Sequence, residues 1–248
     1  MPGMTRTVAV RPEEDALLGR PRQTALLTAA VVAATVVVFA LVADHGVLAR
    51  SQRVDDAWLR LMISGRTAPL TAIAKVLNVL GLVYVTLPVR IALAGFLALR
   101  RRWWHLAAFA AAIVTSEVLI GTLKGSYDRA RPPGSLVATS GASFPSGHAI
   151  AASVTVAAAV IALVPAGRRR VGWGAAAAAF SIVMGLSRAY LGAHWLSDAI
   201  AGIGLGTSCA LVTALVTDQC QRRRSRGSLL RRAARPAGVR PPRHVRSG

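Results

Sequence analysis

Three short polar clusters in the second half of the chain carry residue types suited to phosphate chemistry. They occupy residues 124–132, 145–148 and 187–198. Together they supply several cations, two histidines and a carboxylate. Arginine can grip phosphate oxygens with two parallel hydrogen bonds, and lysine supplies a point charge. This set of side chains therefore predicts a site for an anion with several negative oxygens.

The predicted phosphate-binding residues come from all three clusters. Three fixed positive charges would repel one another unless an anion bound between them. The second cluster opens a predicted helix, where free backbone N–H groups and the positive end of the helix dipole favour a phosphate. A glycine at this point lets the backbone approach the ligand closely. The predicted set is Lys124, Arg131, Ser146, Gly147 and Arg188.

The predicted catalytic residues are His194, His148 and Asp198. His194 and Asp198 are four residues apart, so on a helix they share a face. A carboxylate there can hold the proton of one imidazole nitrogen and leave the other nitrogen free to attack, as in a catalytic triad. The second histidine, His148, can protonate a leaving alcohol oxygen. The cations would offset negative charge on the transferring phosphoryl group.

Six apolar stretches, each near the length of about 20 residues that crosses a bilayer, must position these clusters. Because consecutive spans alternate in direction, all three clusters emerge at the same membrane face. We therefore expect an all-α fold, a polytopic membrane protein built as a six-span helical bundle with an outward-facing phosphate pocket. The stretches are residues 24–43, 80–99, 103–123, 148–165, 171–186 and 195–217.

Composition excludes several other classes of protein. The chain of 248 residues is 54% hydrophobic and carries a net charge of +20. Intrinsic disorder requires low hydrophobicity, and a soluble nucleic-acid binder would carry the charge without the apolar excess. Two cysteines cannot form a disulfide scaffold. These features favour a membrane protein with its charges in loops and tails, and with no nucleic-acid partner.

The basic residues predict how the chain sits in the membrane. Arginine triplets at 100–102 and 168–170 lie tight against span ends, and ten more arginines follow residue 217. Positively charged loops stay in the cytoplasm, so both termini are expected inside and the site outside the plasma membrane. The tail, residues 218–248, is expected to be disordered and attracted to anionic lipid headgroups, or to serve only as a topology signal.

Two further features complete the expected organisation. Residues 1–23 form a cytoplasmic segment, and residues 44–79 lie along the outer interface within the six-span domain of residues 24–217. Arg90 and Glu117 fall inside predicted spans, where ionisable residues are functional candidates. They are expected to form an ion pair within the bundle or to line a substrate pocket, unless the span boundaries are wrongly placed.

The three clusters resemble the signature motifs of the type-2 phosphatidic acid phosphatase superfamily, K-x6-R-P, P-S-G-H and S-R-x5-H-x3-D. Every motif position is matched, in order and at the family's spacing, over residues 124–198. The resemblance implies that His194 is the nucleophile that forms a phosphohistidine, with Asp198 holding it and His148 as the general acid. It implies phosphate binding by the five residues named above. It also implies that no metal or cofactor is needed.

The predicted function is hydrolysis of a phosphomonoester or pyrophosphate on a lipid through a phosphohistidine intermediate. The resemblance offers phosphatidic acid, phosphatidylglycerophosphate or a polyprenyl (pyro)phosphate as substrates, and the sequence does not choose among them. A lipid phosphotransferase using the same site is the nearest alternative. A non-catalytic lipid transporter is a third, which the complete set of acid, nucleophile and carboxylate disfavours. The sequence leaves the oligomeric state open.

Overall fold

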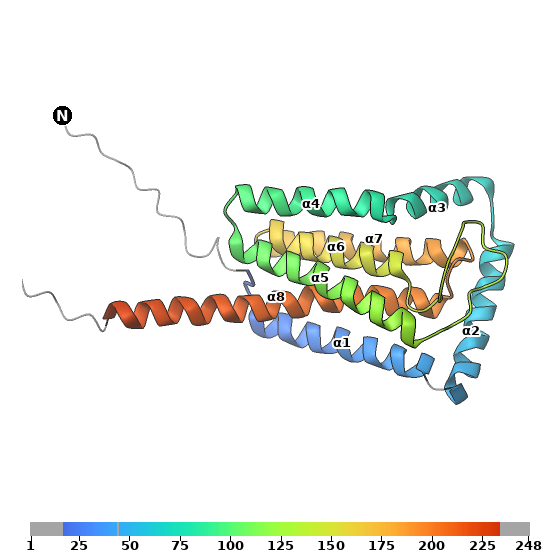
Figure 1. Ribbon diagram of the computed structural model, residues 1–248, viewed down its shortest axis with the longest axis horizontal. Helices are drawn as coiled ribbons and strands as arrows, with labels where there is room; N and C mark the ends of the chain where they lie inside the picture. The colour runs from blue at the N-terminus through green and yellow to red at the C-terminus, as the bar shows by residue number, and fades with distance from the viewer. Residues whose placement is uncertain (1–16, 44, 234–248) are drawn as a thin grey trace, which may run out of the picture.

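A computed structural model describes residues 17–43 and 45–233, which form eight α-helices and no strand (Figure 1). This confirms the prediction of an all-α fold. The helices lie mostly parallel or antiparallel to one another, and helix α2 lies across one end of the bundle. They are α1 (Pro21–Ala43), α2 (His45–Ser64), α3 (Ala68–Leu80), α4 (Val83–Leu99), α5 (Trp103–Ser126), α6 (Gly147–Leu163), α7 (Arg168–Tyr190) and α8 (Leu196–Ala233).

Several of these helices have the length and composition of membrane spans. Within the described residues, α1, α5, α7 and α8 are each long and apolar enough to cross a bilayer, and α3 with α4 would make a fifth, bent span. Helix α6 is apolar throughout but has only 17 residues. Large apolar side chains such as Leu26, Leu99 and Val171 are exposed on the outside of the bundle. Such a surface suits lipid rather than water.

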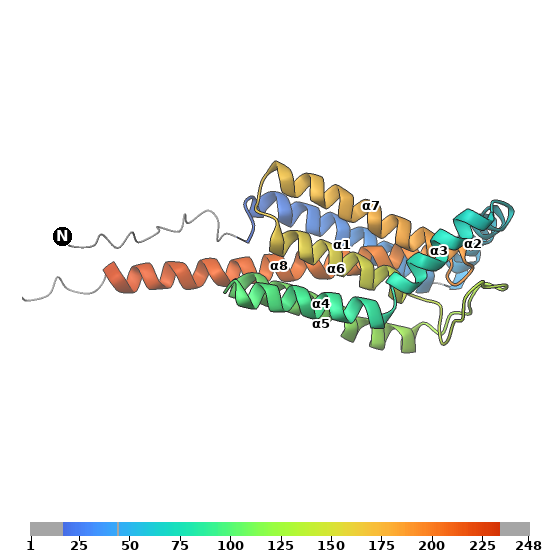
Figure 2. The same ribbon diagram turned by 90° about the horizontal axis from the view of Figure 1, so that it is seen from above.

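The interior of the bundle is built from small side chains, which let the helices approach closely. Alanines of α5, α6 and α8 dominate the main core cluster, among them Ala112 and Ala162. Gly202 and Gly206 of α8 face α6, and a methyl group at either position would collide with Ser153 or with the α6 backbone. The spacing of these two glycines therefore serves packing within one chain, with α6 held between its neighbours (Figure 2).

The segment before α4 differs from the prediction. Residues 44–79 were expected to lie along the outer interface, but only α2 lies across the end of the bundle. Helix α3 begins after Thr67, whose side chain accepts a hydrogen bond from the Leu70 N–H, and ends at Gly81. It then continues into α4 with a bend of 54°. The predicted second span therefore has a helical extension that reaches towards α2 (Figure 1).

At the opposite end of the bundle, α8 contacts the segment that precedes α1. The chain was expected to be disordered from residue 218, but α8 continues to Ala233, and residues 234–248 lie outside the described part. Asp218 is buried and accepts hydrogen bonds from the Leu18 N–H at 3.2 Å and from Arg222 Nε at 2.6 Å. Arg222 also donates to the Leu18 carbonyl. These contacts tie Leu18, just before α1, to α8.

The expected ion pair inside the bundle is present. Arg90 of α4 and Glu117 of α5 lie 2.6 Å apart. The guanidinium of Arg90 also donates to Thr155 Oγ1 of α6 at 2.9 Å and is 7% exposed. The pair therefore links three helices, and the prediction of a structural contact is confirmed.

Candidate active site

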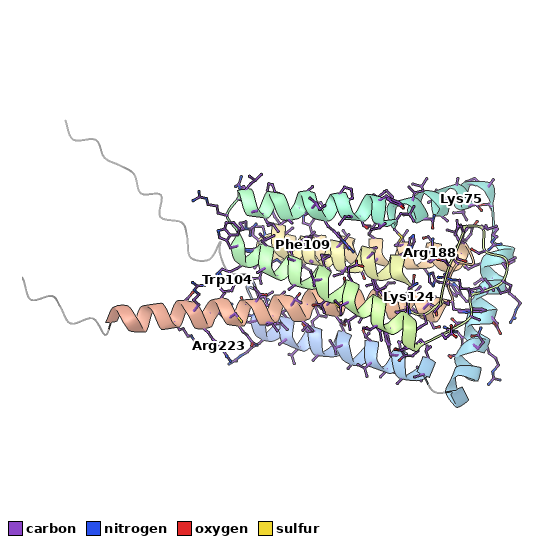
Figure 3. All side chains as sticks on the ribbon, viewed as in Figure 1. Lys75, Trp104, Phe109, Lys124, Arg188 and Arg223 are labelled. Carbon is purple, nitrogen blue, oxygen red and sulfur yellow. The ribbon has the colours of Figure 1, made fainter. Side chains whose placement is uncertain are left out.

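The predicted site residues, far apart in sequence, gather at one end of the bundle. This is the end where α5 and α7 finish and where α6 and α8 begin, beside the loop of residues 127–146. Figure 3 shows Lys124 and Arg188 close to this end, and Arg223 towards the other. The first residue of α1 and the last residue of α8 both lie at that other end. The arrangement agrees with the expectation that the three clusters share one face.

His194 lies in the short loop between α7 and α8, and its ring orientation follows from its neighbours. Nη1 of Arg131 lies 3.3 Å from His194 Nε2. A guanidinium can only donate, so Nε2 presents its lone pair to this cation. The Nδ1 atom, which then carries the proton, lies 3.4 Å from Oδ2 of Asp198. This contact is longer than an ordinary hydrogen bond, as is common for catalytic contacts before substrate binds.

The surroundings of His194 keep its imidazole neutral. Burial lowers the pKa of His194 below its ordinary value of 6.5, because the ring is only 3% exposed. Asp198 opposes this shift, while Arg188 and Arg131 reinforce it. A neutral imidazole that is protonated on Nδ1 and unprotonated on Nε2 is the form that can attack an electrophile.

Backbone carbonyls hold the cations of the site in place. Arg131 donates through Nε to Gly141 O at 2.9 Å and through Nη1 to Ala193 O at 2.7 Å. Lys124 donates to Ala142 O at 3.5 Å, and its side chain also passes over Gly147. The loop around residues 140–142 thus fixes two cations from two different elements beside the start of α6.

Besides Nδ1 of His194, two buried donors of the site have no hydrogen-bond partner among the described residues. They are the hydroxyl of Ser146 and the Nε of Arg188. Ser146 is fixed through its backbone, because its N–H donates to the carbonyl of Asp198 at 3.1 Å. A buried polar group without a partner costs about 1–3 kcal/mol. An anion with several oxygens would satisfy both donors, which fits the predicted phosphate site.

The second histidine, His148, faces the bend between α3 and α4. Its Nε2 lies 3.1 Å from the carbonyl oxygen of Asn78. A carbonyl only accepts, so Nε2 carries a hydrogen, and Nδ1 is the nitrogen that can gain or lose a proton. The side-chain oxygen of Asn78 accepts a hydrogen bond from Arg188. Gly81 lies against the ring, and a methyl group there would collide with it.

Asp198 is fully buried and has partners on both oxygens. Oδ1 accepts a hydrogen bond from Arg129 Nη1 at 2.6 Å. Oδ2 accepts from the Trp195 N–H at 2.9 Å and from the Ser143 hydroxyl. The carboxylate is therefore held in one orientation behind His194.

Sequence reasoning did not identify several of these partners, namely Asp55, Asn78, Gly81, Arg129 and Ser143. Arg129 carried a signal, because it is a further arginine inside the first motif. Asp55 carried a weaker one, as one of only ten acidic residues in the chain. Asn78 and Gly81 gave none, because they were assigned to the interfacial segment and to a span end. The structure brings together all eight predicted site residues.

Metal-ligating side chains do not gather around the site. In the described part of the chain, no group of three or more histidine, cysteine, aspartate or glutamate side chains is placed to hold a metal ion. The cations identified above are the groups placed to meet negative charge.

Comparisons with known proteins agree with this architecture. The chain is similar in structure to a transmembrane PAP2 type phosphatidylglycerolphosphate phosphatase from Bacillus subtilis, with a TM-score of 0.66 and 23% identity over 75% of this chain and 93% of that one. It also resembles LpxE of Aquifex aeolicus, with a TM-score of 0.52 and 24% identity over 62% of this chain and 91% of the other.

The sequence comparisons cover the region of the motifs. No curated protein matches the chain in sequence. The sequence model of the PAP2 superfamily matches residues 102–222, which include every predicted site residue. Over these residues, slightly less than half of the chain, the sequence is similar to the PAP2 superfamily.

Proposed function

We propose that this protein is an integral-membrane phosphatase that removes phosphate from a lipid through a phosphohistidine on His194. The observation that carries the proposal is the position of His194 Nε2, 3.3 Å from Nη1 of Arg131. The unpartnered donors of Ser146 and Arg188 lie in the same motif set. The proposed nucleophile and the proposed anion-binding groups thus lie at the same end of the bundle.

The first chemical step transfers the phosphoryl group to the enzyme. Nε2 of His194 attacks phosphorus, the P–N bond forms and the bond from phosphorus to the leaving oxygen breaks. His148 donates its proton to that oxygen, which leaves as an alcohol or, from a pyrophosphate, as a phosphate. Asp198 stabilises the positive charge that develops on the His194 ring.

The second step returns the enzyme to its starting state. Water attacks the phosphohistidine, His148 takes a proton from that water, and the P–N bond breaks to release inorganic phosphate. Lys124, Arg131 and Arg188 offset the charge on the equatorial oxygens in both steps. No step needs a metal ion, so we propose that the activity is independent of metal.

The fold supports a site within reach of lipid substrates. We propose six membrane crossings, made by α1, the bent α3–α4 pair, α5, α6, α7 and α8. With the arginine-rich ends of α7 and α8 in the cytoplasm, the site faces the outside of the plasma membrane. Such a site can act on a phosphorylated headgroup while the lipid tail stays in the bilayer.

The structural relative from Bacillus subtilis supports a phosphorylated lipid as the substrate class. That protein is a phosphatidylglycerolphosphate phosphatase, so phosphatidylglycerophosphate is one candidate for this chain. Phosphatidic acid and polyprenyl phosphates or diphosphates are the others. If an alcohol rather than water attacks the phosphohistidine, the same site becomes a lipid phosphotransferase.

The decisive experiment measures phosphate release by protein purified in detergent, in the presence of a chelator. We expect wild-type protein to release phosphate from at least one of the candidate lipids, and His194→Ala to release none. Quenching with alkaline detergent during turnover of a 32P-labelled substrate should trap a phosphohistidine that is stable in alkali and lost in acid in the wild type. Equal rates for the variant and the wild type would exclude this mechanism.

The orientation is tested separately. A tag at the C-terminus should be inaccessible from outside intact cells and accessible after permeabilisation. External labelling of that tag would contradict the proposed topology.

A further inference from the structure

The carboxylate behind the nucleophile belongs to a larger charged network that reaches the helix across the end of the bundle. Arg129 bridges two aspartates, with Nη1 2.6 Å from Asp198 Oδ1 and Nη2 2.7 Å from Asp55 Oδ2. Asp55 lies on α2 and Asp198 on α8, 143 residues apart in the chain, as 198 − 55 gives. The network therefore connects α2 to the catalytic carboxylate through a single guanidinium.

Every part of this network is removed from solvent. The side chain of Asp55 is 2% exposed, that of Arg129 is 8% exposed and that of Asp198 is fully buried. Arg129 also lies over the Trp195 ring, 5.6 Å from its centre. Charges buried to this degree are retained only when their geometry is fixed and their remaining hydrogen-bonding capacity is used.

Asp55 also fixes the start of α8. Its Oδ1 accepts from the Ser197 N–H at 2.9 Å, and its Oδ2 accepts from the Ser197 hydroxyl at 2.6 Å. A carboxylate at a helix N-terminus satisfies free N–H groups and is favoured by the helix dipole. Asp198 lies one residue after Ser197, so the same contact sets the position of the catalytic carboxylate along the axis of α8.

We propose that Asp55 and Arg129 are positioning residues for the His194–Asp198 pair, and that α2 is thereby part of the active site. This inference rests on the proposed function, because it assigns the residues a role behind the same nucleophile. The network carries two negative charges and one positive charge. It therefore balances the imidazolium that forms when His194 becomes phosphorylated, and it holds Asp198 in line with Nδ1.

Asp55 and Arg129 have opposite effects on the stability of a positively charged His194 ring. Removing the charge of Asp55 leaves Arg129 paired with Asp198 alone, which weakens the support of the carboxylate for an imidazolium. Removing the charge of Arg129 strengthens that support but frees the orientation of Asp198. The other groups that face His194 are unchanged by either substitution. They are Lys124 of α5, Arg131 of the 127–146 loop, His148 of α6 and Arg188 of α7.

The test compares Asp55→Asn and Arg129→Gln with wild type, using kcat and KM for one lipid substrate from pH 4.5 to 8. We expect kcat to fall by about 10- to 100-fold in both variants, as for other residues that orient a catalytic ligand, with a smaller change in KM. The acid limb of the pH profile should move to lower pH in Asp55→Asn and to higher pH in Arg129→Gln. A loss caused only by structural damage would not move the limb in opposite directions.

Matched controls separate the local effect from a general one. Asp128→Asn removes the same charge next to Arg129, but Asp128 is exposed and has no polar partner in the described structure. It should keep wild-type kinetics. If Asp55→Asn does not fold, Asp55→Glu restores the charge at the same place and should show reduced kcat with an acid limb close to wild type.

The outcomes distinguish this inference from the proposed function. If wild-type protein is active through His194 but both network variants keep its kcat and pH profile, Asp55 and Arg129 are not positioning residues and the proposed function stands. The same holds if both variants move the acid limb in one direction. If wild-type protein forms no phosphohistidine, the proposed function itself fails.

Discussion

The two histidines of the site are held in opposite ways. His194 lies in front of a buried carboxylate, and behind that carboxylate is an arginine bridged to a second aspartate. Among the described residues no carboxylate contacts the ring of His148, which lies against the backbone carbonyl of Asn78 and against Gly81. A group that must carry positive charge during phosphoryl transfer thus has fixed charges behind it, whereas a group that must pass a proton has neutral contacts.

This difference has a chemical reason. A nucleophilic histidine gains full positive charge when phosphorus bonds to Nε2, so an anion behind Nδ1 lowers the barrier. A general acid must be able to lose its proton, and a carboxylate at hydrogen-bonding distance would hold the proton back. At this end of the bundle the described chain therefore places two buried acids, Asp55 and Asp198, on the side of His194 and the α3–α4 bend against His148.

The largest expected effect distinguishes the two histidines by the substrates on which each variant loses activity. His194→Asn should lose activity by about 10⁴-fold or more on every phosphate ester, because the nucleophile is gone. His148→Asn should lose about 10²- to 10⁴-fold on a lipid phosphate but far less in the first step with 4-nitrophenyl phosphate, whose leaving group needs no proton. Rapid-mixing kinetics of His148→Asn with 4-nitrophenyl phosphate should therefore show a burst of 4-nitrophenol equal to the enzyme concentration. Equal losses of both variants on both substrates would contradict the assigned roles.

The neutral contact of His148 can be broken without altering any charge. Gly81 has φ of −85°, which alanine also adopts, so Gly81→Ala changes only the space against the ring. We expect kcat to fall by about 100-fold, since small misplacements of a catalytic group have effects of this size. Gly95→Ala is the matched control, because Gly95 on α4 faces open space and its substitution should leave kcat unchanged. Wild-type kinetics for Gly81→Ala would show that this contact does not position the acid.

The pH dependence reports the environment of the nucleophile. Burial lowers the pKa of His194 below 6.5, so the ring stays neutral at pH 6.5 and becomes protonated only at lower pH. Because the protonated ring cannot attack, kcat/KM for a substrate whose own ionisation is complete should fall with an acid limb below pH 6.5. The pH dependence of kcat/KM should be compared with the pH dependence of binding of a non-hydrolysable inhibitor. This comparison separates the ionisation of the enzyme group from that of the substrate. An acid limb above pH 6.5 would mean that Asp198 outweighs burial.

The smallest effect on catalysis is expected from the ion pair deeper in the bundle. Arg90 and Glu117 join three helices but contact neither histidine, and the Glu117 side chain is 52% exposed. Glu117→Gln should lower the free energy of unfolding by about 1–3 kcal/mol, measured by thermal unfolding in detergent, with kcat close to wild type. The swapped double variant, Arg90→Glu with Glu117→Arg, should recover stability that each single variant loses. An absence of recovery would remove the pairing as the reason for their positions.

The sequence predicted the eight proposed site residues better than the groups that contact and position them. The eight site residues follow from residue type and spacing, because their chemistry needs particular side chains at fixed intervals. Asp55 and Asn78 act through contacts between helices that are distant in sequence, and no local spacing signals such contacts. Gly81 matters only through the space next to His148, which becomes visible when α3 and α6 are placed together.

The same distinction applies to the fold. Hydropathy predicted the apolar helices, since about 20 apolar residues form a local pattern. It did not predict that residues 68–80 would continue α4 after a bend, because Lys75 and Asn78 lower the hydropathy of that stretch. Hydropathy also missed the helical extension of α8 past residue 217, where Asp218 and Arg222 contact Leu18.

The hydrogen bonds between Leu18 and α8 have a consequence for how the two ends of the bundle are related. Asp198 and Asp218 are 20 residues apart on one helix, about 30 Å, which is the thickness of the hydrocarbon core. Helix α8 therefore carries the carboxylate behind His194 at one end of the bundle and the contacts with Leu18 at the other. A chain that stops after α7 would lack both, so the proposed site and the closure of the opposite end of the bundle depend on one helix.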